Sequence, residues 1–489
     1  MIALLTVLTL AAGISGDLRV RAEHSWPDPA GITEGLWQGN ALSFYERLRI
    51  HAGPWDSVLL TEKDPGEEWG DLLTGGVSFT DQGILKVAAG ALRVNLAHGL
   101  MFSHPGPFSG GDPLNLSKTP NWRLRIDLSE SPGANDADPL TGAAVEYHLS
   151  DLTFSTVLGW SNIDPGSSGL HRTVSELESR RSVQEKLAVL RAGFGPVGLS
   201  SAWIRQNGDS LSTSFTRVGA DFLFQTEEKD AVFTGEITSD LDSTLNFVVS
   251  GSRGLADLRH ALTISRYTGN WPRSAGTMGP DHRIGAGYGV RWRPVQKVTV
   301  DAGVLILDKE EEDSYKAGVQ FTERLTSRTS LTQRMKFTAT AEERTFRAQI
   351  TTSWSPYSDL TLSLKVPVTW YRSNSNPDEN GTGLEVRLKH SPLAELDLTA
   401  SASAASTGGW NSRVYAYSLS FPGEFGSKAL YNSSVLLQGA VSVHISEDAT
   451  LRLKGAWYSM DGAESLGSGS SETEGPSRTS AGVQLDWSF

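Results

Sequence analysis

Apolar and polar residues alternate with a period of two along most of the chain after Asp17. Over residues 360–371 the even positions are Leu, Leu, Leu, Val, Val and Trp, whereas the odd positions are Thr, Ser, Lys, Pro, Thr and Tyr. Residues 384–389 and 451–454 repeat the alternation with charged residues inside the segment. A period of two indicates β-strands with one apolar and one polar face. We therefore predict strands whose apolar side chains face lipid and whose polar side chains face a wet lumen.

The connections between these segments differ in length in a regular way. Residues 355–359 and 391–395 form short turns, whereas 268–282 and 459–478 form long polar connections. Short turns on one side and long loops on the other are typical of outer-membrane barrels. The sequence thus predicts an all-β protein, a transmembrane antiparallel β-barrel of roughly 22 to 26 strands with a short helix in a long connection. The alternation changes phase once within residues 406–433, which indicates one miscounted strand there.

The chain ends on a strand-like segment. Alternate residues from Ala481 to Phe489 are apolar or aromatic, and they include Trp487. Bacterial outer-membrane barrels commonly end in this way, and the machinery that assembles them recognises the final strand. We predict that Trp487 and Phe489 form this assembly signal, with the barrel assembly machinery and outer-membrane lipid as partners.

The first residues have the character of a targeting segment. Residues 1–16 form an apolar run followed by small residues, with Ala11 and Gly13 suited to a cleavage site. This pattern predicts a cleavable signal peptide over 1–16 and a barrel over 17–489. A membrane-spanning helix needs about twenty apolar residues, and this run is shorter. Strands must therefore cross the membrane, so we expect an integral protein of a Gram-negative outer membrane. A soluble secreted β-protein is the alternative.

Composition narrows the chemistry that is available. The chain has no Cys, which excludes disulfides, thiolate metal ligands and cysteine nucleophiles. Its formal net charge is −13, so no general affinity for nucleic acid is expected. Neither a nucleophile elbow nor a His-Glu-x-x-His motif occurs. We predict no catalytic residue, no metal site and no cofactor, and an outer-membrane enzyme is the less favoured class.

A barrel of this size encloses more space than its wall side chains fill, so part of the chain should lie inside it. Two long connections, 98–120 and 162–186, are the candidates. We expect the second to occlude the lumen, because residues 173–186 combine a candidate N-cap with good helix formers. The favoured function is a plugged or gated channel that passes or docks a solute or polymer. The alternative is a structural or assembly barrel that presents loops to a partner protein.

Charged residues on the polar phase of the strands are the candidate lumen surface. They are Arg123, Arg125, Asp127, Glu146, Lys365, Glu385, Arg387, Lys389, Arg452 and Lys454. Solvation and mutual ion pairing inside the wall are the simplest roles for them. Their mixed signs argue against a strongly ion-selective pore.

Several short motifs occur in order along the chain. They are EKDPGE at 62–67, LRVNLAHGLMF at 92–102, GLHRTVSEL at 169–177, FTGE at 233–236, SRYTGNW at 265–271 and LGSGSSETEG before the last strand. With these motifs the chain, over residues 43–489, resembles the barrel portion of large outer-membrane proteins of Bacteroidota and related bacteria. In those proteins a small helix-hairpin-helix domain commonly precedes the barrel. The resemblance implies a large barrel and assigns no activity to it.

The chain departs from that family pattern in two places. No helix-hairpin-helix module precedes the predicted first strands, so DNA binding is not carried over. A Gly-Gln-Gly type turn is replaced by Ala97, His98 and Gly99. The motif residues that the resemblance singles out as site candidates are Glu62, Lys63, Asp64, Glu67, His171, Arg172, Thr173, Glu236, Arg266 and Tyr267.

Two of these motifs carry groups that suggest chemistry. EKDPGE holds three carboxylates and a Lys, which suit acid–base work or a divalent cation. Asp-Pro-Gly is also what a turn requires, and a turn with ion-paired neighbours is the favoured interpretation. The His-Arg-Thr sequence at 171–173 suits an anionic ligand or a helix cap, and structural packing of this segment against the wall is favoured.

Overall fold

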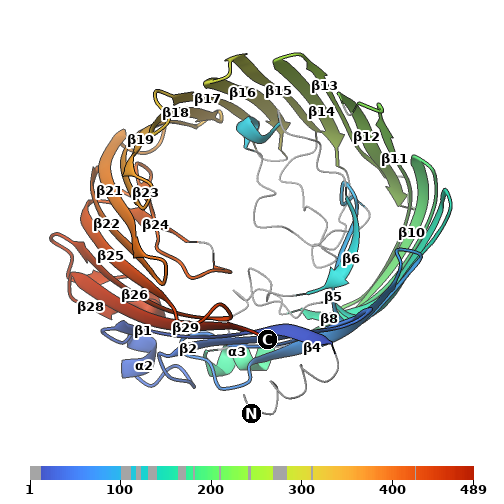
Figure 1. Ribbon diagram of the computed structural model, residues 1–489, viewed down its shortest axis with the longest axis horizontal. Coiled ribbons are helices and arrows are strands. Elements are labelled where there is room, and N and C mark those ends of the chain that lie inside the picture. The colour runs from blue at the N-terminus through green and yellow to red at the C-terminus, as the bar shows by residue number, and fades with distance from the viewer. Residues whose placement is uncertain are drawn as a thin grey trace.

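The computed structural model describes residues 13–100, 112–116, 123–129, 140–163, 172–179, 182–208, 211–228, 230–240, 244–267, 284–309, 312–424 and 426–489. Within these residues 24 antiparallel strands close into a barrel, a number inside the predicted range (Figure 1). In order around the wall they are β1 (Ile14–Trp26), β2 (Ser43–Ala52), β3 (Trp55–Lys63), β4 (Leu72–Asp81), β5 (Leu85–Ala97), β7 (Leu140–Leu149), β8 (Leu152–Ile163), β9 (Val183–Phe194), β10 (Val197–Gly208), β11 (Leu211–Gln225), β12 (Ala231–Asp240), β13 (Leu245–Leu255), β14 (Leu258–Arg266), β15 (Ile284–Val295), β16 (Val298–Asp308), β17 (Ser314–Arg324), β18 (Thr329–Ala339), β19 (Glu343–Tyr357), β20 (Leu360–Ser373), β21 (Glu379–Leu393), β22 (Leu396–Thr407), β25 (Ser433–His444), β26 (Ala449–Met460) and β29 (Ser477–Ser488).

The two faces of each wall strand follow the predicted alternation. On β20, Leu364 and Trp370 are 45% and 42% exposed, whereas Thr369 and Tyr371 between and beside them are buried. Apolar groups left exposed on the outer face of a closed barrel are in contact with lipid in a membrane. The inward row of the same strand includes Lys365, which bonds to groups inside the barrel. The predicted phase of this strand is confirmed.

Closure joins the two ends of the described chain. β29 pairs with β1, and Phe489 exchanges two main-chain hydrogen bonds with Gly16 at N···O distances of 2.8 and 3.0 Å. β1 begins at Ile14 rather than at the predicted residue 17. The predicted signal peptide stays a prediction, because residues 1–12 lie outside the described part. Cleavage at or before Gly13 would leave β1 whole.

The short turns lie at the end of the barrel where β1 begins and β29 ends, and the long connections lie at the other end. In outer-membrane barrels the short turns face the periplasm. We call the opposite end, with the long connections, the loop end.

One strand leaves the wall halfway along its length. β5 pairs with β4 up to Gly90 and with β7 up to Leu92. From Leu92 onward it pairs with β6 (Arg123–Leu128), which lies inside the ring (Figure 1). We call the described residues 92–100, 112–116 and 123–129 the first insert.

A compact apolar cluster holds the first insert to the inner wall. Leu92, Val94 and Leu96 of β5 and Ile126 of β6 pack against inward residues of neighbouring strands. Those wall residues are Ala88, Ala144, Val157, Leu187, Val189, Ala202 and Ile204. Burying one such side chain away from water contributes roughly 1.5–3 kcal/mol. The β5–β6 part of the insert is therefore firmly seated.

A second stretch lies inside the barrel between β22 and β25. It contains the hairpin of β23 (Val414–Tyr417) and β24 (Ser427–Leu430), which pair only with each other (Figure 1). We call residues 408–424 and 426–432 the second insert. The change of phase within residues 406–433 has this cause: the miscounted strand is a hairpin in the lumen rather than part of the wall.

The helical segment is shorter than predicted. α3 spans Val174–Ser179, and β9 already begins at Val183, so the end of the predicted helix is strand. Thr173 caps α3 by accepting the amide of Glu176, whose carboxylate accepts the amide of Thr173 in return. This reciprocal pattern is a capping box. No described helix is long and apolar enough to cross a membrane.

The segment around α3 does not fill the lumen in the part that the structure describes. Arg172 lies over the ring of Trp37 at 4.7 Å, and its carbonyl accepts the amide of Gln38. Both partners belong to the connection between β1 and β2, which also carries α2 (Ala30–Thr33). The expected occlusion by residues 162–186 is therefore wrong for 172–179, which pack among the loop-end connections. Residues 164–171 and 180–181 lie outside the described part.

Candidate functional site in the barrel lumen

The first insert is held at β12 by one buried carboxylate. Glu236 is 1% exposed and accepts the amides of His98 at 2.9 Å and Leu100 at 3.0 Å. The carbonyl of Leu100 accepts a hydrogen bond from Arg217 of β11, which also pairs with Asp240. Glu236, a candidate from the FTGE motif, thus anchors the insert to the wall.

His98 is neutral in this position. Burial lowers the pKa of its imidazole to about 4 from 6.5. Its Nε2 lies 2.9 Å from the hydroxyl of Thr234, two residues before Glu236 on β12. The substituted Ala-His-Gly turn therefore supplies a side chain that bonds to the wall, and its burial disfavours the protonated form.

The insert contacts the wall again beyond β13 and β14. The 3-10 turn η1 (Pro113–Asn115) contacts β15, β16 and β17. Asp112 caps this turn by accepting the amide of Leu114, and it bonds to Arg334 at 2.7 Å and to Lys336 at 2.6 Å, both on β18. Burial alone would raise the pKa of Asp112, but the hydrogen bond and the charge of Lys336 hold it below its usual value.

Glycines make room for η1 on three neighbouring wall strands. A Cβ at Gly303 of β16 would lie 2.0 Å from the carbonyl oxygen of Pro113. At Gly287 and Gly318, on the strands to either side, a Cβ would meet Leu116 and Leu114 at 2.8 and 3.0 Å. The alternation of the sequence places these glycines on the inward face of adjacent strands, but it does not indicate which segment packs against them.

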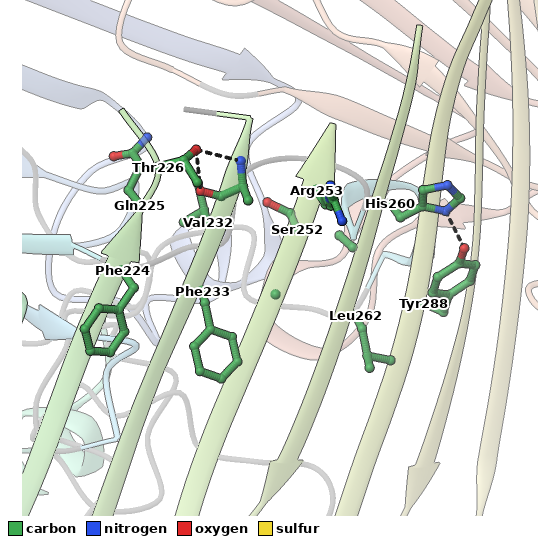
Figure 2. Close-up of a pocket in the computed structure, with 13 residues that line it drawn as sticks. Phe224, Gln225, Thr226, Val232, Phe233, Ser252, Arg253, His260, Leu262 and Tyr288 are labelled. Atoms are coloured by element: carbon green, nitrogen blue, oxygen red, sulfur yellow. Dashed lines mark hydrogen bonds between the residues drawn. The ribbon is translucent and has the colours of Figure 1, made fainter. Parts of the chain in front are cut away.

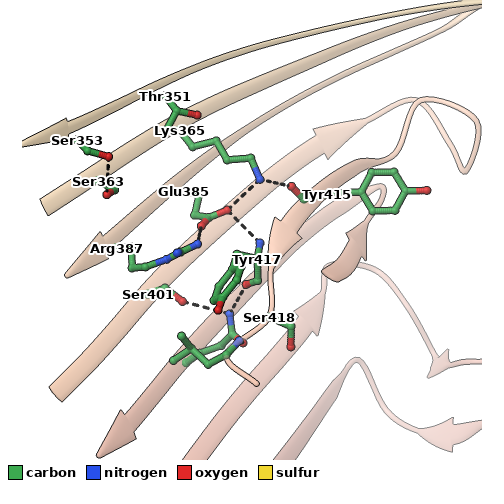
Figure 3. A network of polar contacts seen from close by, with 12 residues as sticks. Thr351, Ser353, Ser363, Lys365, Glu385, Arg387, Ser401, Tyr415, Tyr417 and Ser418 are labelled. Atoms are coloured by element: carbon green, nitrogen blue, oxygen red, sulfur yellow. Dashed lines mark hydrogen bonds and ion pairs between the residues drawn. The ribbon is translucent and has the colours of Figure 1, made fainter. Parts of the chain in front are cut away.

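The second insert is held by charges that the sequence placed in the lumen (Figure 3). Glu385 is 3.2 Å from Lys365 and 2.7 Å from Arg387, and it accepts the amide of Tyr417. Lys365 donates to the carbonyl of Tyr415 at 2.7 Å. The guanidinium of Arg387 lies 3.8 Å from the ring centre of Tyr417. These three candidates face the lumen and position the insert there.

The remaining lumen candidates also have partners, with few exceptions. Lys454 bonds to Glu23 at 2.8 Å and to Glu424 of the second insert at 2.9 Å. Arg452 pairs with Asp486, and Glu146 with His148. Lys389 lies on the inward phase of β21 and is exposed.

Three candidates do not belong to the wall, which corrects their assignment. Arg123, Arg125 and Asp127 lie on β6 of the first insert. Asp127 pairs with Arg125 and, at 2.6 Å, with Lys86 of β5. Their alternation matches that of a wall strand, because β6 also has one apolar and one polar face.

EKDPGE forms the turn that its sequence favours. Lys63 is 2% exposed, and its amine donates to the carbonyls of Asn40, Leu42 and Asp64. Glu67 accepts the amide of Asp64. These hydrogen bonds hold the connection between β1 and β2 in place. Glu62, the first residue of the motif, lies on the lumen-facing side of β3 and interacts electrostatically with Arg21. These contacts are structural.

The other motif candidates are spread over the loop end. Arg172 and Thr173 lie at the start of α3, as described above. Arg266 ends β14 on its exposed phase, and Tyr267 follows it. Burial raises the pKa of Tyr267, with a smaller effect from the charge of Glu236. His171 lies outside the described part.

A surface groove lies on the outer face of the barrel. It has a volume of about 590 Å³ and is lined by Phe224, Phe233, Leu262 and Tyr288 (Figure 2). Gly251, which has no side chain, forms part of its floor. Phe233 and Leu262 are each 49% exposed. The imidazole of His260 lies 2.5 Å from the hydroxyl of Tyr288. An apolar groove on this face meets the acyl chains of the bilayer, so it is a lipid contact.

Chemistry by metal ions gains no support from the described residues. No group of three or more His, Asp and Glu among them is placed to hold a metal ion.

The closed wall, its apolar outer face, and the separation of short turns from long loops define an integral outer-membrane β-barrel.

Comparison with known proteins adds no family. No protein-family model and no curated protein matches the chain. Among solved structures, the ferric-catecholate import receptor Fiu of E. coli K12 aligns with 97% of this chain and 81% of its own, at 11% identity and a TM-score of 0.44. The P pilus usher PapC translocation pore aligns with 97% and 99%, at 10% identity and a TM-score of 0.43.

An anion-selective porin of Comamonas acidovorans aligns with 63% of this chain and 99% of its own, at 11% identity and a TM-score of 0.35. At these identities and TM-scores the likenesses say nothing about activity. The resemblance to the barrels of Bacteroidota stays a prediction.

Proposed function

We propose that this chain is a gated outer-membrane channel whose lumen is narrowed by the two inserts, and that a solute passes or docks there when the first insert shifts. The observation that carries this proposal is the path of the first insert. It leaves the wall at β5, bonds to β12 through Glu236, and reaches β18 through Asp112. The described parts of this insert lie inside the ring, where they narrow the path that a solute would take.

The two ends of the first insert differ in how strongly they are held. The β5–β6 end buries several apolar side chains against the wall, each worth roughly 1.5–3 kcal/mol. At the other end, Arg334 and Lys336 retain 36% and 33% exposure while they pair with Asp112. Ion pairs this exposed contribute about 0–1 kcal/mol each. The η1 end also buries Pro113 and Leu114, against the larger set of apolar side chains at the β5–β6 end, so the η1 end is the less firmly held of the two.

The test is a side chain that fills the seat of η1. Gly303→Val places methyl groups where the carbonyl of Pro113 lies, so η1 should leave the wall. We expect the variant to show a larger single-channel conductance than the unaltered barrel in planar lipid bilayers. Gly439→Val is the matched control, because nothing lies within 4 Å of a Cβ at Gly439.

Presentation of loops to a partner protein is the second candidate. At the loop end, main-chain hydrogen bonds link the connections: Ala30 to Glu472, Gln38 to Arg172 and Gly39 to Gly66. Leu36 and Trp69 remain 48% and 61% exposed on these connections. A barrel that serves only this role should carry no current with or without Gly303→Val, and that result would replace the channel by the second candidate.

A further inference from the structure

Charges of opposite sign are paired over much of the lumen wall. Arg191 of β9 and Asp221 of β11 form a two-point ion pair with 4% and 3% exposure. On β15 and β16, Arg291 bonds to Asp301 at 2.7 Å. Pairing of this kind neutralises charge locally and leaves little attraction for a solute ion.

On the part of the wall between the two inserts, positively charged side chains are grouped together. β18 and β19 turn Arg334, Lys336 and Arg347 toward the lumen, and Arg413 of the second insert lies beside them. Lys336 is near enough to Arg334 and Arg347 for mutual repulsion, as Arg347 is to Arg413. In the described part, the carboxylate that forms ion pairs with this group is Asp112 of the first insert. We call these four cations the cationic strip.

The cationic strip has donors left over. The buried Nε atoms of Arg334 and Arg347 have no hydrogen-bond partner in the described part of the chain. Among the described residues Arg413 has no carboxylate partner; it lies 4.4 Å from the ring centre of Trp410 and donates to the Trp410 carbonyl and the Tyr415 hydroxyl. Leaving buried donors and like charges uncompensated is destabilising. Planar guanidinium groups match the two oxygens of a carboxylate or phosphate.

We propose that the cationic strip binds a small dianionic solute with phosphate or carboxylate groups, and that Asp112 occupies part of this site as an internal substitute. The inference rests on the proposed channel and supplies its class of substrate. A solute anion that takes Arg334 and Lys336 displaces Asp112, so binding of the solute loosens the η1 end of the first insert. The mixed signs of the candidate lumen charges argued against a strongly ion-selective pore, and this strip departs from that mixture locally.

Binding to the full-length barrel in detergent micelles tests the site directly. Inorganic phosphate and succinate are titrated separately by isothermal titration calorimetry, with uncharged glycerol as the negative probe. We expect Arg347→Gln to weaken binding at least tenfold. Arg344→Gln is the matched control, since Arg344 lies on the same strand but on the opposite, outer phase, and should leave binding unchanged. Heat-dependent gel migration confirms that each variant is folded.

Asp112→Asn separates this site from a nonspecific attraction. Removal of the internal competitor should raise the affinity for the dianion severalfold, whereas loss of a negative charge that merely supports the fold would not. The proposal is overturned if the unaltered barrel shows no saturable binding, if Arg344→Gln weakens binding as much as Arg347→Gln, or if Asp112→Asn lowers the affinity. Binding of phosphate alone or succinate alone upholds the site and names its ligand.

The experiments test the proposed channel and the proposed anion site independently. A barrel that binds the dianion but carries no current, even with Gly303→Val, loses the channel and keeps the site. A barrel whose current rises with Gly303→Val but that binds neither anion keeps the channel and loses the site.

Discussion

Adjacent residues on one wall strand face different environments, one the lipid and the other the lumen. On β19, Ile350 faces outward and is 50% exposed, whereas Gln349 faces the lumen and donates to the hydroxyl of Thr351. Ile350 lies midway along the outward row between Phe346 and Trp354. Aromatic residues gather near the two interfaces of a membrane barrel, so Ile350 lies near mid-depth.

A charge should therefore be tolerated at one of these positions and not at the other. Ile350→Arg places a cation among lipid chains near mid-depth, which costs about 2–4 kcal/mol. Gln349→Glu places a charge in the lumen beside the cations Arg334 and Arg347, and it should change the free energy of unfolding by less than about 1 kcal/mol. Urea titration of both variants in lipid vesicles measures the difference. Equal costs at the two positions would contradict the faces assigned to β19.

Buried ion pairs are the residue-scale feature that the sequence described least well. The candidate charges were placed on the correct face, with solvation and mutual ion pairing as their expected roles, but their contacts with the inserts were not predicted. In the structure, Lys365, Glu385 and Arg387 bind the second insert, and Glu236 binds the first. Alternation reports which face a side chain takes; it does not report which distant segment lies against that face. Arg123 and Arg125 were misplaced for the same reason.

At the scale of elements, the inward turn of β5 distinguishes this barrel from a plain wall. Residues 92–97 alternate in the same way as a lipid-facing strand, with Leu92, Val94 and Leu96 on one side. Their apolar side meets an apolar patch of the inner wall instead of lipid. The sequence cannot separate these two surroundings, since both require one apolar face.

The same element gives the first insert a dependence on pH. The pKa of His98 is about 4 in the docked insert and 6.5 when the imidazole is free. As pH falls from 6.5 to 4, the released histidine takes up a proton and the docked one does not, so docking weakens across this window. The largest possible effect is about 3 kcal/mol. Channel conductance should rise as pH is lowered from 7 to 5.

His98→Gln should remove this dependence, because the amide side chain does not titrate in the window. Two carboxylates face this position from the wall: Glu236, which holds the insert amides, and Asp221, whose charge acts on His98. Conductance curves recorded between pH 7 and 5 in the variant and the unaltered barrel give the comparison. An equal rise in both proteins would assign the pH effect to another group.

At the scale of the whole molecule, the ring is closed by its two chain ends. The ring of Phe489 packs against Gly16, where an added Cβ would lie 2.6 Å from the nearest ring atom. The ring centres of Phe489 and Trp487 are 5.1 Å apart. The predicted assembly signal thus also forms part of the closing seam.

Deletion of Phe489 should reduce the amount of assembled barrel in the outer membrane. It removes both main-chain hydrogen bonds to Gly16 and the terminal aromatic ring at once. Phe489→Tyr keeps the backbone and a ring, and we expect it to assemble like the unaltered chain. The measurement is the fraction of protein in the outer membrane that shows heat-dependent gel migration. Normal levels after the deletion would contradict a role of this residue in closure.

The barrel class and the approximate strand number could be predicted because period-two segments recur through the chain and each one needs a neighbour. The exact number could not, since β6, β23 and β24 have strand patterns but lie inside the ring. The choice of plug was wrong in its described part for a related reason. The helix-forming sequence at 173–186 favoured the connection 162–186, whereas residues 113–116 of the connection 98–120 pack against glycines of the wall.

The reach of the first insert sets an order of events during folding. Asp112 precedes its partner Arg334 by 222 positions in the sequence, and its seat is built from β15, β16 and β17. The entropic cost of closing a loop grows with its length, and no contact offsets that cost until the far strands exist. η1 can therefore dock only once β15, β16 and β17 have formed, so this part of the barrel interior is completed after the wall strands that hold it.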